Sequence, residues 1–198
     1  MSKINYYALG IMAAVVSFLG FIVENVWLAI TEGYINNRNM HAPFLIGYGM
    51  LILAIYLVLG TPDKVILFRK YEKKTTKVKS YLLYFVLAFV VVCVAEIVLG
   101  TIVEKVCHIN YWNYSWLPLH ITKYTSVPTS FLFASLITFF MGVIFQPLMT
   151  LILKINPKVM KVLSIVLVVV MLVDYLYSFY WMIKKKNFLL KWKFVFRK

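Results

Sequence analysis

Five long apolar stretches dominate this sequence and restrict what the chain can fold into more than any other feature. A helix needs about 20 mostly apolar residues to cross the hydrocarbon core of a bilayer. The stretches cover residues 6–31, 43–60, 80–106, 128–153 and 159–183. The sequence therefore predicts an all-α, polytopic integral membrane helical bundle of five transmembrane helices, with residues 1–183 as a single transmembrane domain.

The composition argues against a water-soluble fold. Of the 198 residues 63% are hydrophobic and 14% are charged, whereas a soluble domain is about half apolar and about a quarter charged. The net charge is +14, but its basic residues form short runs between the apolar stretches. Such runs are typical of loops at an anionic membrane surface. We therefore expect membrane lipids as partners and no nucleic acid.

The basic runs also predict an orientation. Residues 62–79 carry seven lysines and arginines, and residues 154–161 carry three lysines. The positive-inside rule places both loops, and the N-terminus, in the cytoplasm. A basic C-terminal tail, residues 184–198, then lies outside after five crossings, which conflicts with that rule. Either a crossing is miscounted or the tail is an exception, with residues 188–196 along the membrane interface.

Two of the apolar stretches share a pattern. Residues 24–32 and 96–104 align at an offset of 72, which superposes Glu24 on Glu96 and Glu32 on Glu104. Each stretch is followed by a polar loop, a further apolar helix and a basic loop. The pattern favours a parallel repeat of two helix–loop–helix units plus a fifth helix, as in some transporters. Chance similarity between apolar helices is the alternative.

Acidic residues inside the predicted helices are the main candidates for function. A charge inside a bilayer costs several kcal/mol, so it usually faces a protein interior or water. Glu24 and Glu96 lie well inside their helices, and Asp174 lies inside the fifth. Glu104 follows Glu96 by eight residues, on one helical stripe. These carboxylates either line a polar pocket for a cation, a proton or a polar head group, or link helices through hydrogen bonds.

The polar loop around Trp112 is the most unusual local sequence, because it interleaves aromatic residues with Asn113, Ser115 and Pro118. An aromatic belt at the membrane interface explains Trp112 and Tyr114. A re-entrant loop that folds onto the carboxylates would also explain the polar residues, which can pair with its exposed backbone. Both interpretations stay open.

Other kinds of site find little support. Glu104 and His108 are four residues apart and would share a helical face, but no third ligand has the spacing of a metal site. We therefore expect no metal and no cofactor. The sequence contains no phosphate-binding loop of the P-loop type, so ATP hydrolysis by this chain is not expected.

Polar and small residues form a wider pattern along the chain. Its first half consists of Glu24, Asn37, Arg38, Ala42, Pro43, Tyr48 and Gly49. Its second half consists of Glu96, Glu104, Trp112, Asn113, Tyr114, Ser115, Asp174 and Ser178. With this pattern the sequence resembles, over residues 18–180, a family of small bacterial membrane proteins, the "Putative ABC-transporter type IV" or CmpB-like permeases. Asn39 and Asn113 depart from the glycine and aspartate of the family, and residues 118–124 lack its arginine.

The resemblance implies a permease-like protein of the bacterial plasma membrane. Our leading hypothesis is a transporter with an intramembrane carboxylate-lined pocket for a small cationic or lipid-head-group ligand. A partner ATPase or another membrane subunit would be needed if transport is driven by ATP. The alternatives are a membrane-embedded enzyme that acts on a lipid or isoprenoid, and a structural or assembly subunit. The candidate ligand-binding residues are Glu24, Asn25, Asn37, Arg38, Glu96, Glu104, Trp112, Asn113, Tyr114, Ser115 and Asp174.

Overall fold

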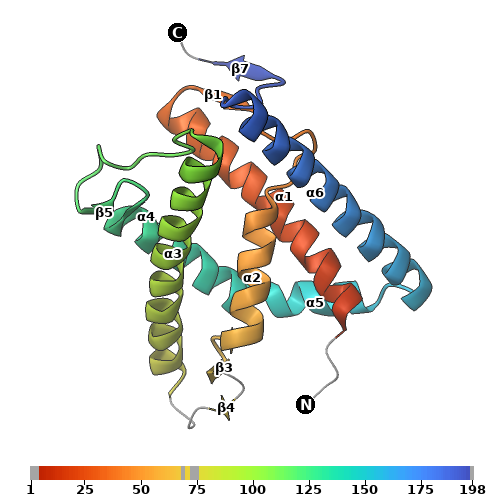
Figure 1. Cartoon of the computed structure of the whole chain (residues 1–198). Helices are drawn as coiled ribbons and strands as arrows, with labels where there is room; N and C mark the ends of the chain where they lie inside the picture. Colours follow the sequence, from red (N-terminus) through yellow and green to blue (C-terminus); the bar gives the residue numbers. More distant parts are fainter. Residues whose placement is uncertain (1–4, 68–69, 72–75, 197–198) are drawn as a thin grey trace. The chain divides into compact units, whose positions relative to one another are not determined.

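Helices make up most of the computed structural model, which describes residues 5–67, 70–71 and 76–196. Within these residues the chain forms five helices (Figure 1). They are α1 (Tyr6–Thr31), α2 (Ile46–Leu59), α3 (Lys77–Cys107), the continuous helix of α4 (Val127–Phe139), η1 (Phe140–Ile144) and α5 (Phe145–Leu153), and α6 (Pro157–Lys185). The predicted all-helical membrane fold with five helices is therefore confirmed at the level of the helices.

Four of the five helices are long and apolar enough to cross a membrane. Helix α1 has 26 residues, α3 has 31, the helix from Val127 to Leu153 has 27 and α6 has 29. Helix α2 has 14 residues, which at about 1.5 Å per residue is roughly 21 Å long and short of the hydrocarbon core. The structure thus shows four candidate spans and one shorter apolar helix where five spans were expected.

A proline explains the irregular middle of the helix from Val127 to Leu153. Pro147 has no backbone N–H, and its ring crowds the carbonyl four residues earlier. The π-helical segment η1, which covers Phe140–Ile144, lies directly before it. Such a bulge is a common way to absorb a disturbance of the hydrogen-bond ladder, so the helix continues past the proline.

Short strands replace three connections that the sequence predicts as loops. Strand β1 (Tyr34–Asn36) pairs antiparallel with β7 (Lys193–Val195), from the C-terminal tail. Strands β2 (Gly60–Thr61), β3 (Lys64–Leu67) and β4 (Lys70–Tyr71) form a ribbon, and β5 (His120–Thr122) pairs with β6 (Thr125–Ser126). The basic residues Arg69, Lys73 and Lys74 of the predicted cytoplasmic loop lie outside the described residues.

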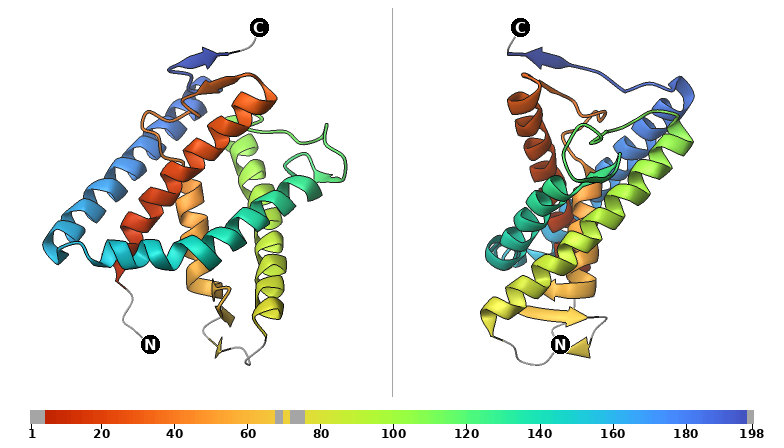
Figure 2. Two further views of the ribbon diagram at one scale, coloured as in Figure 1. Left: turned by 180° about the vertical axis from the view of Figure 1, so that it is seen from behind. Right: turned by 90° about the vertical axis from the view of Figure 1, so that its left-hand side faces the viewer.

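The chain divides into two compact units, Met1–Leu53 with Leu148–Lys198, and Ala54–Pro147. In the first unit α1 and α6 lie side by side and run in the same direction (Figure 2). Near their beginnings the Asn5 amide donates to the Met160 sulfur at 3.5 Å, and beyond their ends β1 pairs with β7. The predicted boundary between a transmembrane domain and a tail at residue 184 stays a prediction.

In the second unit α3 packs along α4. The rings of Phe85 and Phe131 meet edge to face at 5.1 Å between centroids. The Tyr84 side chain is fully buried and donates to the Gly60 carbonyl at 3.2 Å. The other face of α3 exposes a row of valines, at positions 86, 90, 94 and 98. A helix with apolar residues on every side is typical of a membrane span.

Candidate functional site

Glu24 forms an ion pair inside the first unit. Its carboxylate accepts from the Arg38 guanidinium at 2.9 Å and from the Tyr48 hydroxyl at 2.5 Å. Arg38 comes from the loop after β1, and Tyr48 from the first turn of α2. The Tyr48 ring lies so close to Gly20 that a Cβ there would overlap it. A glycine one turn before the glutamate therefore lets the tyrosine reach the carboxylate.

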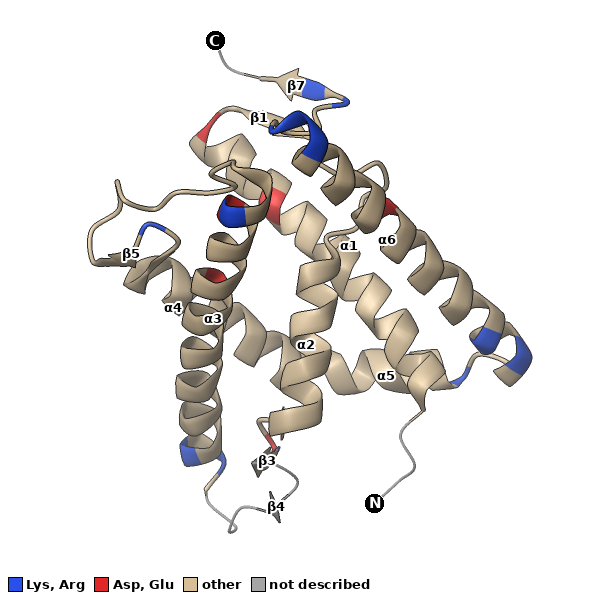
Figure 3. Cartoon of the chain, in the orientation of Figure 1, with Lys and Arg blue, Asp and Glu red and all other residues tan. Residues whose placement is uncertain are grey.

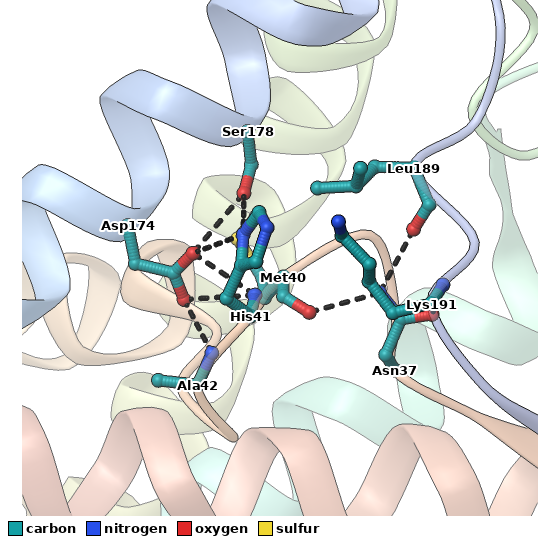
Figure 4. Close-up of polar contacts among 8 residues, drawn as sticks. All are labelled: Asn37, Met40, His41, Ala42, Asp174, Ser178, Leu189 and Lys191. Carbon is teal, nitrogen blue, oxygen red and sulfur yellow. Dashed lines mark hydrogen bonds and ion pairs between the residues drawn. The ribbon is translucent and has the colours of Figure 1, made fainter.

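Asn25 and Asn37 form hydrogen bonds with backbone groups. The Asn25 amide oxygen accepts the N–H of Asn36 at 2.8 Å. Asn37 is 2% exposed, and its amide donates to the carbonyls of Met40 and Leu189, both at 2.8 Å. Its oxygen accepts the N–H of Lys191 at 3.0 Å. These contacts satisfy backbone groups of two distant segments at once, so Asn37 fastens the C-terminal tail to the loop after β1 (Figure 4).

Asp174, on α6, forms hydrogen bonds with the same loop. Its side chain is 8% exposed, and it accepts the backbone N–H groups of His41 and Ala42 at 2.9 Å and 2.7 Å. The Ser178 hydroxyl donates to it at 3.1 Å, and the His41 imidazole lies 3.2 Å away. Figure 4 shows the carboxylate facing these groups. Hydrogen bonds from backbone N–H groups stabilise a carboxylate in its charged form.

Glu96 lies in the interior of α3 and meets hydroxyl groups of the second unit. Thr125 donates to its carboxylate at 2.5 Å and Ser130 at 3.2 Å. The two hydroxyls also contact each other at 2.8 Å and are buried. Figure 3 shows the acidic residues of α3 in red. Counted from the end of α3 at Cys107, Glu96 lies about 17 Å along the helix axis.

Glu104, two turns further on, forms an ion pair with a loop residue. The Lys123 ammonium donates to its carboxylate at 2.5 Å. The Tyr124 hydroxyl donates to the other oxygen of the same carboxylate. The bond to Glu104 raises the pKa of Lys123 above its usual value. Partial burial, and then the bond to Glu104, raise the pKa of the Tyr124 hydroxyl. Both loop groups therefore stay protonated around neutral pH.

The loop around Trp112 folds back on the segment that carries these groups. The Trp112 indole donates to the Tyr124 carbonyl at 2.8 Å, and the Tyr114 N–H donates to the Lys123 carbonyl at 2.8 Å. Asn113 accepts the N–H of Ser115 at 2.8 Å, which closes a local turn. The loop residues thus position Lys123 and Tyr124, while a re-entrant path through the bilayer stays a prediction.

The two glutamate clusters have the same construction. Residues 19–26 and 99–106 share six of eight residues in the pattern Leu-Gly-x-Ile-Val-Glu-x-Val. Gly100 lies against the Tyr124 ring as Gly20 lies against Tyr48. In both clusters the glutamate accepts from that tyrosine and from a loop cation. The contacts therefore match Glu24 with Glu104, at an offset of 80, whereas the sequence alignment pairs it with Glu96.

The predicted site residues thus fall into separate groups within the two units. Their partners were not anticipated from the sequence, namely His41, Tyr48, Lys123, Tyr124, Thr125 and Ser130. The repeated octapeptide was the available signal, because a tyrosine follows each copy in the next loop or helix. Among the described residues no group of three or more histidine, cysteine, aspartate or glutamate side chains could hold a metal ion.

Comparison with known proteins identifies the family of this chain. No curated protein and no solved structure matches the chain. A family of membrane proteins matches residues 11–179, which span α1 through most of α6 and include every glutamate and aspartate discussed above. The chain therefore belongs to the family described as "Putative ABC-transporter type IV".

Proposed function

We propose that this chain is a permease-like, multi-pass membrane protein in which Glu96 binds the cationic group of a small ligand or of a lipid head group. The observation that carries the proposal is the Glu96 carboxylate in the interior of a candidate span, with the Thr125 and Ser130 hydroxyls as partners. An ionisable residue at such a depth is costly and usually functional.

The partners of Glu24 and Glu104 indicate a role for these two carboxylates. Arg38 and Lys123 neutralise Glu24 and Glu104, so these two carboxylates position loops. The Thr125 and Ser130 hydroxyls that donate to Glu96 can also accept from an arriving ligand. Thr125 and Ser130 can therefore stay in contact with Glu96 when its charge is matched by a bound cation.

The loop around Trp112 supports the Glu96 site indirectly. Glu104 and Trp112 both bind Tyr124, which precedes Thr125 in the chain. Fixing Tyr124 orients the Thr125 hydroxyl toward Glu96, as supporting residues commonly do for a binding group. In this proposal Trp112, Asn113, Tyr114 and Ser115 position the site rather than touch the ligand.

We also infer five crossings of the membrane. Because α1 and α6 run in parallel, the chain must cross an odd number of times between the end of α1 and the start of α6. Helix α3 and the helix from Val127 to Leu153 are candidate spans and can supply two of these crossings. In this proposal α2 supplies the third, and the residues that flank it make up the length that its 14 residues lack. With residues 62–79 in the cytoplasm, the plasma membrane of a bacterium is the expected location.

The repeated octapeptide supports a duplicated helix–loop–helix unit in this architecture. Its register is an offset of 80, since that offset matches both the residues and their contacts. Parallel repeats of this kind occur in transporters. Transport would be passive, coupled to an ion or driven by a partner ATPase, because the sequence has no phosphate-binding loop.

The test compares wild-type protein with Glu96→Gln and with the control Glu32→Gln, which alters an exposed glutamate at the end of α1. Thermal unfolding in detergent is followed with sodium, potassium, ethanolammonium and choline chlorides at constant ionic strength. We expect at least one cation to raise the melting temperature of wild type and Glu32→Gln, but not of Glu96→Gln. An equal rise in all three proteins would remove Glu96 from the site.

A structural role is the second candidate, and the pairing of Glu24, Glu104 and Asp174 favours it. If Glu96 is also only a link between α3 and the Thr125 segment, Glu96→Gln will lower the melting temperature without cation. None of the four cations will then stabilise the wild-type protein specifically.

A further inference from the structure

The C-terminal tail is fastened to the first unit by a dense set of hydrogen bonds. We use the name tail surface for residues 184–196. Strand β7 lies in register with β1, with Ile35 opposite Phe194. The Phe196 N–H donates to the Gly33 carbonyl at 2.8 Å, and the Leu189 side chain is buried. The tail surface therefore has a defined position beyond the ends of α1 and α6.

The tail surface presents two kinds of exposed side chain. Its lysines, at positions 184, 185, 186, 191 and 193, are all exposed, and residues 184–198 contain no acidic residue. The same segment carries large apolar side chains that are mostly exposed, among them Phe194 at 60% and Phe196 at 64% exposure. Lys193 also lies over the Tyr34 ring at 3.7 Å from its centroid, an arrangement of cation and aromatic face that holds the lysine in place.

The position of the tail surface determines which part of the membrane it can contact. Helices α1 and α6 are candidate spans, so the segment that directly follows both ends lies at the level of the lipid head groups. There, aromatic rings settle at the boundary of head groups and acyl chains. Each lysine close to the surface gains about 1 kcal/mol from anionic lipid.

We propose that the tail surface binds anionic lipid head groups of the membrane that contains the protein. The lysines contact the phosphates, and Phe194 and Phe196 enter the interface beside them. This binding explains a strongly basic segment on the side opposite the other basic loops. Anionic lipid on that side of the membrane attracts the lysines of the tail surface, so the tail surface does not need to lie in the cytoplasm. The proposal does not depend on the ligand of Glu96.

The experiment measures cleavage of the tail by chymotrypsin, which cuts after aromatic residues and leucine. The full-length protein is placed in nanodiscs of either phosphatidylglycerol or phosphatidylcholine with the same acyl chains, and mass spectrometry follows the fragments. We expect cleavage after Phe188, Trp192 and Phe194 to be on the order of tenfold slower in phosphatidylglycerol. High salt should reduce the difference.

Two variants separate charge from burial and from folding. Changing all five lysines of the tail surface to glutamine should abolish the difference between the two lipids. The matched control changes Lys154, Lys158 and Lys161 to glutamine, in the connection before and at the start of α6, and should keep it. Equal cleavage rates in both lipids for the wild type would overturn the proposal. So would a difference that persists when the five lysines are removed, and binding of a single-stranded oligonucleotide in preference to phosphatidylglycerol.

Discussion

The clearest quantitative prediction concerns Asp174→Asn, which preserves the shape of the side chain. In the structure one carboxylate oxygen accepts the Ala42 N–H and the other accepts the Ser178 hydroxyl. The His41 N–H lies between the two oxygens, at 3.1 Å from the first and 2.9 Å from the second. Asparagine keeps one oxygen, which can still accept both backbone N–H groups, and places an amide NH2 group where the other was. Both N–H groups then donate to a neutral oxygen, and the His41 N–H loses its shorter bond.

The magnitude follows from the change in the kind of bond. A hydrogen bond to a charged group contributes about 1.5–3 kcal/mol, whereas one between neutral groups contributes about 0.5–1.5 kcal/mol. Because two backbone N–H groups are affected, we expect the segment around His41 and Ala42 to lose about 2–3 kcal/mol of its stability against local opening. Since a tenfold change corresponds to about 1.4 kcal/mol, their amide exchange should accelerate roughly 30- to 150-fold.

Hydrogen exchange read by mass spectrometry on peptides that contain His41 is the suitable assay. The control is Asp63→Asn, because the Asp63 side chain is 52% exposed and lies 3.7 Å from the Lys77 ammonium. Such a surface pair contributes less than about 1 kcal/mol. Unchanged exchange at His41 and Ala42 in Asp174→Asn would show that the carboxylate does not hold this loop, and would return Asp174 to the ligand-binding candidates.

Two further predictions concern the second unit. Gly100→Ala places a methyl group in the Tyr124 ring and should destabilise the protein by about 1–3 kcal/mol. The control Gly47→Ala has open space around the new Cβ and should be neutral or stabilising by up to about 1 kcal/mol. Thermal unfolding in detergent compares the two variants, and equal melting temperatures would contradict the close packing of Gly100 against Tyr124. Because the bond to Glu104 raises the pKa of Lys123, the stabilisation it provides is complete below the ordinary lysine pKa and disappears as the pH rises through the raised value. The melting temperature of Lys123→Met should therefore lie below that of wild type at neutral pH and converge with it only above pH 10.5, and convergence at lower pH would refute the assignment.

The sequence was sufficient to predict the helices, because apolar stretches of this length have few other solutions. In lipid every backbone N–H and C=O must be satisfied within the segment, and a helix does this by itself. Helix α1 covers the predicted residues, Tyr6–Thr31. The same local pattern placed Glu24, Glu96 and Asp174 inside helices. Family membership was also visible in local motifs.

The tertiary structure decided which groups meet. Glu24 and Glu104 lie in octapeptides that share six of eight residues, yet their cations come from loops 14 and 19 residues away. The β1–β7 pair joins Tyr34 to Val195, and no local preference encodes such a distant pairing. The predicted alignment of Glu24 with Glu96 stays a prediction, while the contacts of Glu24 resemble those of Glu104. Hydrophobicity depends on neighbours in sequence, whereas an ion pair depends on the path by which a loop returns to its helix.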